Sequence, residues 1–152
     1  MRRVLVTRPE PGASRTAGRL AALGFEPVLL PLTKIVPLPV ETWSGAENIA
    51  ALAITSANAV RHAPPSLLRD LAGLPAFAVG ERTGQVAAEA GVSVKDAGAG
   101  DADRLAERIV ASVQPGSKIL LLCGRIRRGT LESRLAAAGL PVRAIETYDT
   151  VP

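Results

Sequence analysis

An α/β fold with a mostly parallel sheet is the fold class that this sequence predicts. Short apolar runs of strand length alternate with stretches of helical periodicity along the whole chain. In three of these units a glycine ends the helix before the next apolar run, at Gly24, Gly91 and Gly139. Such alternation implies parallel strands joined by right-handed crossovers. The composition, 47% hydrophobic but only 3% aromatic, suits close packing of helices on a sheet.

The strands are expected where apolar runs are bounded by turn residues. In chain order they are Val4–Thr7, Val28–Leu30, Ala50–Thr55, Ala76–Val79, Val92–Val94, Lys118–Cys123 and Val142–Tyr148. Helices are expected between them, from apolar spacing and capping residues. They cover 13–23, the stretch from Ser56 until Pro64-Pro65 interrupts it, 66–71, a helix ending at Ala90, 104–113 with Asp101 or Asp103 as its cap, and 130–138.

The segment Pro31–Pro39 holds three prolines and little periodicity, so it is expected to be a stiff, extended connector between domains. The stretch Thr42–Asn48 is expected to be a loop or a short helix. Residues 1–30 contain only two strands and one helix, too few to cover both faces of those strands. Either these strands join the main sheet, or they pack against strands that this chain lacks.

Composition and charge disfavour several classes of function. Eighteen Lys and Arg against fourteen Asp and Glu give a net charge of +4, which suits a small polyanionic substrate without requiring one. No long basic run is present, and exposed aromatic residues for stacking bases are scarce, so we expect no nucleic-acid partner. No apolar stretch is long enough for a membrane span and none resembles a signal peptide, which predicts a cytoplasmic protein. The single Cys123 lies in an apolar run and predicts neither a disulfide nor a metal site.

Three junctions between a strand and the next helix carry polar residues that could bind an anion. At the first, Ser56 and Asn58 stand beside backbone amides that are free at a helix start, although Ser56 could simply cap the helix. At the second, Gly80 would permit a tight turn or a close approach to a ligand, and Thr83 follows near the helix start. The alternative there is an ordinary turn with a capping residue, and no glycine-rich dinucleotide fingerprint is present.

The third junction, Gly124–Gly129, contains three arginines that either clamp carboxylates or phosphates or form an ordinary solvated loop. His62 is expected on the surface, and no Ser–His–acid or metal-ligand set accompanies it. Tyr148 ends the last strand, where ligand sites open in parallel sheets, although packing at the sheet edge is an alternative.

The order of these segments resembles the uroporphyrinogen-III synthase family. The similar blocks are Val6-Thr7-Arg8-Pro9, Thr55–Val60, Ala78–Thr83, the Gly124–Gly129 loop with Leu131, Leu135 and Gly139, and the ending Glu146–Pro152. The resemblance implies two α/β domains with three-layer parallel sheets and a cleft between them. Residues 1–33 would open a discontinuous first domain, 34–37 would be a crossover linker, 38–146 a complete second domain, and 147–152 the return crossover. Because the family continues further, the chain is expected to be C-terminally truncated.

The activity that the resemblance implies is a hydro-lyase and cyclase reaction without a cofactor or a metal, in tetrapyrrole and haem biosynthesis. Hydroxymethylbilane would close to uroporphyrinogen III, with loss of water and inversion of the terminal pyrrole ring, on a monomeric protein. Tyr148 would assist departure of the hydroxyl, and Arg8, Ser56, Asn58, Gly80, Thr83 and Arg128 would bind the substrate. One alternative is an inactive α/β fragment that only binds an anionic tetrapyrrole-like ligand. Another is a flavodoxin-like receiver or nucleotide binder, which lacks its phosphate fingerprint here.

Overall fold

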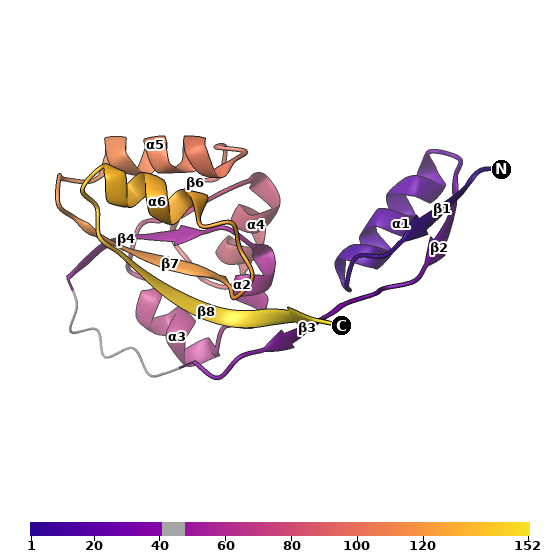
Figure 1. The fold of residues 1–152 in the computed structure, drawn as a ribbon. Helices are drawn as coiled ribbons and strands as arrows, with labels where there is room; N and C mark the ends of the chain where they lie inside the picture. Colours follow the sequence, from indigo (N-terminus) through magenta and orange to yellow (C-terminus); the bar gives the residue numbers. More distant parts are fainter. Residues whose placement is uncertain (41–47) are drawn as a thin grey trace. The chain divides into compact units, whose positions relative to one another are not determined.

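The computed structural model describes residues 1–40 and 48–152, and these form two compact units (Figure 1). Unit 1 comprises Met1–Val36 and Thr150–Pro152, and unit 2 comprises Pro37–Asp149. The stretch expected as a loop or short helix at 42–48 lies outside the described residues, except for Asn48. The α/β class with a mainly parallel sheet is confirmed.

Unit 1 is built on one β-α-β motif. Strand β1 (Arg3–Val6) pairs in parallel with β2 (Glu26–Leu29), and helix α1 (Gly12–Ala22) connects them. The two strands form a separate two-stranded sheet, so of the two alternatives the one in which they join the main sheet is wrong. Ala13 and Ala17 of α1 are buried, whereas Leu5 in β1 is 56% exposed.

The main sheet has the strand order β3-β8-β7-β4-β5-β6, and unit 2 contains its strands β4 to β7 and residues 142–149 of β8. The pairs from β8 to β6 are all parallel, as strands joined by helical crossovers must be. The strand bounds are β3 Lys34–Pro37, β4 Ile49–Ile54, β5 Ala76–Ala78, β6 Val94–Asp96, β7 Lys118–Gly124 and β8 Val142–Val151. The helix bounds are α2 Ala57–Arg61, α3 Pro65–Leu71, α4 Glu81–Glu89, α5 Ala102–Ser112 and α6 Thr130–Ala137.

Helices cover both faces of this sheet, which gives unit 2 three layers (Figure 1). Helices α2, α3 and α4 pack on one face, in a core that includes Leu52, Leu71 and Leu120. Helices α5 and α6 pack on the other face, in a core that includes Leu121 and Leu135. We call these the α2–α4 core and the α5–α6 core. Strand β4, and β7 after its first residue Lys118, lack charged side chains because both of their faces are covered.

The boundaries show where local patterns predict well and where they do not. Asp101 accepts a hydrogen bond from the Arg104 amide at 2.8 Å and therefore caps α5, as one of the two expected caps. Helix α3 begins at Pro65, one residue before the expected start, because proline is well suited to the first position of a helix. The connector is extended, but it also contains the strand β3, whose neighbour in the sheet is β8. Strand β6 begins at Val94, so the expected strand Val92–Val94 is placed two residues too early.

Candidate functional site

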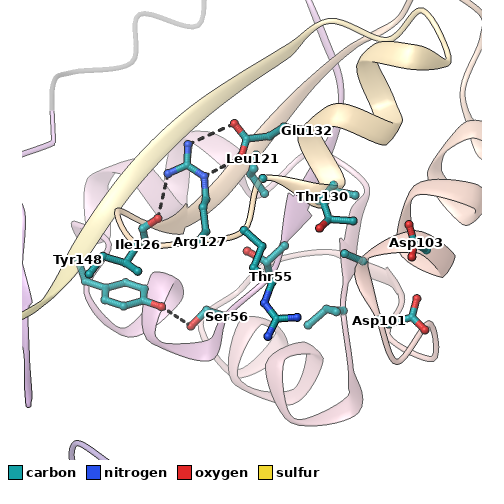
Figure 2. Close-up of a pocket in the computed structure, with 16 residues that line it drawn as sticks. Thr55, Ser56, Asp101, Asp103, Leu121, Ile126, Arg127, Thr130, Glu132 and Tyr148 are labelled. Carbon is teal, nitrogen blue, oxygen red and sulfur yellow. Dashed lines mark hydrogen bonds and ion pairs between the residues drawn. The ribbon is translucent and has the colours of Figure 1, made fainter.

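The carboxyl ends of β4, β5 and β7 meet at one edge of the sheet in unit 2, where ligand sites form in parallel α/β folds. A cavity of about 420 Å³ opens there. Its walls come from the junctions after these strands, the starts of α5 and α6, and one side chain of β8. Figure 2 shows that Ser56 and Tyr148 face each other in this cavity.

Of the two roles that the sequence left open for Ser56, the structure confirms helix capping. The Oγ of Ser56 accepts a hydrogen bond from the Asn58 amide at 3.2 Å. The same oxygen also accepts a hydrogen bond from the Tyr148 hydroxyl at 2.9 Å. A serine hydroxyl has two acceptor sites and one donor proton, so both acceptor sites are filled and the proton of Ser56 can still donate.

The ring of Tyr148 packs against the edge of the α2–α4 core. The His62 ring lies near it, with 6.1 Å between the ring centroids. Burial, and secondly the charge of Arg61, lower the pKa of His62 below its ordinary value of 6.5. The imidazole beside Tyr148 is therefore neutral at pH 7.

The loop between β7 and α6 does not present three equivalent arginines. Arg127 donates to both carboxylate oxygens of Glu132, at 2.7 and 3.2 Å (Figure 2). It donates to Glu146 as well, at 2.6 Å. It also donates to the carbonyl oxygens of Gly124 and Arg125. The hydrogen bonds that Arg127 donates to Glu132, and to a smaller extent to Glu146, raise the pKa of Arg127 despite its partial burial. Arg127 therefore fixes the loop and is not available to clamp a ligand.

Arg128 remains as the cation that this loop offers to the cavity. Arg125 pairs with Asp149 at 3.4 Å, whereas Arg128 is exposed and has no ion-pair partner among residues 1–40 and 48–152. Gly129, at φ +72°, lets the chain turn into α6 immediately after it.

The cavity wall also contains acidic groups that the sequence analysis considered only as caps. Asp101 caps α5, and Asp103 accepts a hydrogen bond from Arg134 at 2.8 Å. The cavity therefore has walls of mixed charge, with Arg128 as its exposed cation.

The other predicted site residues lie outside this cavity. The Asn58 side chain accepts a hydrogen bond from Arg61 at 3.0 Å. Gly80 has an extended backbone with open space around it, so the position does not require glycine. Thr83 is only 7% exposed within α4. Arg8 belongs to unit 1, where its guanidinium lies over Gly12 and donates to Thr16.

Thr147 is a residue that the sequence analysis did not single out. It is fully buried, and its hydroxyl donates to the carbonyl oxygen of Ala59 in α2 at 2.7 Å. The next residue, Tyr148, contacts the residue that caps the same helix. Two consecutive residues of β8 are therefore bonded to α2 and to its capping residue. The sequence of β8 contains no signal for this role, because the strand carries several polar residues and the partner of Thr147 is 88 residues away.

Neither a metal centre nor a membrane span is found in the part of the chain that the structure describes. Within it, no three His, Cys, Asp or Glu side chains are grouped so that they could hold a metal ion. No helix in the same residues has the length and apolar character needed to cross a membrane.

The chain is similar to known proteins over its full length. The sequence model of the family "Uroporphyrinogen-III synthase HemD" matches residues 14–152. A uroporphyrinogen-III synthase from Chlorobaculum parvum is 28% identical over 160 residues, a match that covers 100% of this chain and 65% of that protein. The chain thus spans just under two thirds of the length of this curated relative.

Two solved structures share the fold. A mutant uroporphyrinogen III synthase from Thermus thermophilus matches with a TM-score of 0.70 and 22% identity, over 100% of this chain and 64% of that one. A uroporphyrinogen-III synthetase from Helicobacter pylori matches with a TM-score of 0.65 and 21% identity, over 99% of this chain and 62% of that one. With the family match over most of its length, the chain belongs to the uroporphyrinogen-III synthase family.

Proposed function

We propose that this protein catalyses the reaction for which its family is named. Hydroxymethylbilane would close to uroporphyrinogen III, with loss of water and inversion of the terminal pyrrole ring. The observation that carries the proposal is the Tyr148 hydroxyl, which lies in a cavity at the carboxyl edge of the sheet and is bonded to Ser56 at 2.9 Å. The family membership supports the same activity.

The reaction requires two things of the protein, a proton donor for the leaving hydroxyl and a site that holds the substrate in one conformation. The hydroxymethyl C–O bond breaks with electron donation from the pyrrole nitrogen, and the departing hydroxyl leaves as water once it receives a proton. We propose that Tyr148 supplies that proton. Ser56 accepts from Tyr148 and from the Asn58 amide, and it still has a donor proton of its own. Holding the reacting ends together then favours ring closure over free solution chemistry.

The carboxylates of the substrate require donors as well. Arg128 is the exposed cation of the cavity and is proposed to bind one of them. Asn58, Gly80 and Thr83 in unit 2 and Arg8 in unit 1 remain proposed contacts for other parts of the substrate. The compact unit 37–149 supports the domain organisation that the resemblance implies, with 38–146 as a complete second domain. We propose that the protein acts as a cytoplasmic monomer, without a nucleic-acid or membrane partner.

The test is turnover of hydroxymethylbilane, scored as type III over the type I product that forms without an enzyme. We expect an excess of type III from the chain, reduced about 100-fold or more in Tyr148→Phe, because a general acid contributes about 10²–10⁴. Ser112→Ala is the matched control, since it removes a hydroxyl that bonds within α5 and lines no part of this cavity.

Two results would overturn the proposal. The absence of any type III excess from the unaltered chain would remove the activity. Full activity in Tyr148→Phe would remove the role of the phenol. In the first case, amide NMR shifts at Ser56 and Arg128 on titration with uroporphyrin III would identify a protein that only binds such ligands.

A further inference from the structure

Strand β8 changes its alternation immediately before Tyr148. Residues of β8 pair with β7 one for one up to Glu146, which lies opposite Cys123, but the next partner, Gly124, lies opposite Tyr148. Thr147 is therefore an extra residue, as in a β-bulge. Bulges kink a strand and re-aim the side chains that follow.

The direction of the change can be read from the packing on the two faces. Without a bulge, Tyr148 would share a face with Glu146, which binds Arg127 beside α6. Instead, Tyr148 packs against the α2–α4 core, on the same face as Ile145. Thr147 points to this face too, since its hydroxyl reaches Ala59. The extra residue thus brings two consecutive side chains to α2.

Gly124 supplies the space that the ring then occupies. A Cβ atom added to Gly124 would lie 2.5 Å from Cζ and 2.8 Å from the hydroxyl oxygen of Tyr148. The φ of Gly124 is not in the left-handed region, so glycine is required there by space and not by backbone conformation. The phenol therefore packs closely against Gly124 while its hydroxyl is bonded to Ser56.

We propose that Gly124 is a positioning residue, which together with the bulge at Thr147 holds the Tyr148 hydroxyl against Ser56. The inference deepens the proposed function, because it names what places its proton donor. In Gly124→Ala the ring would have to withdraw by about 1 Å to reach an ordinary carbon–carbon distance of about 3.5 Å. A displacement of that size at a reacting group costs about 100-fold in rate.

The inference can be tested without turnover because Tyr148 is the single tyrosine of the chain. Its ¹³Cζ resonance is therefore assigned without ambiguity in a ¹³C-tyrosine-labelled sample. We expect Ser56→Ala to shift this resonance in the unaltered chain, because a hydrogen bond to the phenol is lost. We expect Gly124→Ala to shift the resonance too, because the ring is displaced from Ser56. In the Gly124→Ala background, adding Ser56→Ala should then shift the resonance by less than a third of the shift that Ser56→Ala causes alone.

Gly73→Ala is the matched control, since Gly73 has open space around it and no left-handed φ. It should leave the tyrosine resonance unchanged. The inference would be overturned if Ser56→Ala shifted the tyrosine resonance equally in the original chain and in the Gly124→Ala variant. If Gly124→Ala fails to fold, the unaltered chain decides: a strong NOE between the Gly124 Hα protons and the Tyr148 ring is expected, and its absence overturns the proposal.

Turnover then separates this inference from the proposed function. Gly124→Ala should lower kcat about 100-fold with little change in KM, whereas Gly73→Ala should change neither. If the chain makes no type III product, only the proposed function is overturned. The comparison of tyrosine chemical shifts in the single and double variants still decides whether Gly124 positions the phenol. Normal kcat in a folded Gly124→Ala variant overturns the inference alone.

Discussion

Replacing Thr147 by valine should destabilise unit 2 through one hydrogen bond. The substitution preserves the shape of the side chain and removes only the hydroxyl, which donates to the Ala59 carbonyl at 2.7 Å in a fully buried site. Within α2 there is no substitute donor, because the Ala63 amide bonds to Val60 and the His62 amide to Asn58. Leaving a buried acceptor unpaired costs about 1–3 kcal/mol, so we expect the free energy of unfolding to fall by that amount.

Urea unfolding at pH 7, followed by far-UV circular dichroism, measures this difference. Thr83→Val is the matched control, because Thr83 is also buried but its hydroxyl has no hydrogen-bond partner within residues 1–40 and 48–152. It should change the free energy of unfolding by less than about 0.5 kcal/mol. Equal effects of the two substitutions would refute the reasoning, since the Thr147 bond would then add nothing beyond burial of a hydroxyl.

Two titrations test the electrostatics of the same unit. Burial raises the pKa of Cys123 to about 11, so above pH 9 the unfolded thiol ionises while the folded one stays neutral. Stability should therefore fall between about pH 9 and 11, by up to about 3 kcal/mol, and Cys123→Ala should remove that part of the decline in urea unfolding. The pKa of His62, the single histidine, is lowered, so its NMR titration should have a midpoint below 6.5 and stability should fall as pH decreases through that region. A midpoint above 6.5, or a pH dependence unchanged by Cys123→Ala, would contradict these assignments.

The sequence predicts elements well where local chemistry determines them. Apolar runs covered on both faces, such as β4 and β7, and the cap at Asp101 are properties of short segments, and the structure confirms them. The role of Arg127 could not be found in this way, because one of its carboxylate partners, Glu146, is 19 residues away on strand β8.

The candidate site could be predicted only in part for a similar reason. Ser56, Arg128 and Tyr148 meet at one cavity because parallel strands bring their carboxyl ends together, which the strand–helix alternation predicts. The bulge at Thr147 depends on the register between β7 and β8, and this register cannot be read from the sequence of either strand alone. The space over Gly124 has meaning only once Tyr148 is known to lie opposite it.

The carboxylates around Arg127 also bear on how an anion would reach the cavity from solution. Because Glu132 and Glu146 neutralise the Arg127 guanidinium, Arg127 adds little to the positive electrostatic potential outside the cavity. The attraction then comes mainly from Arg128, and at physiological ionic strength the field of one exposed charge decays over about 8 Å. The Gly124–Gly129 loop therefore contributes little long-range electrostatic attraction for a polyanion. The affinity for such a molecule comes from shape complementarity and from hydrogen bonds that form after it has entered the cavity.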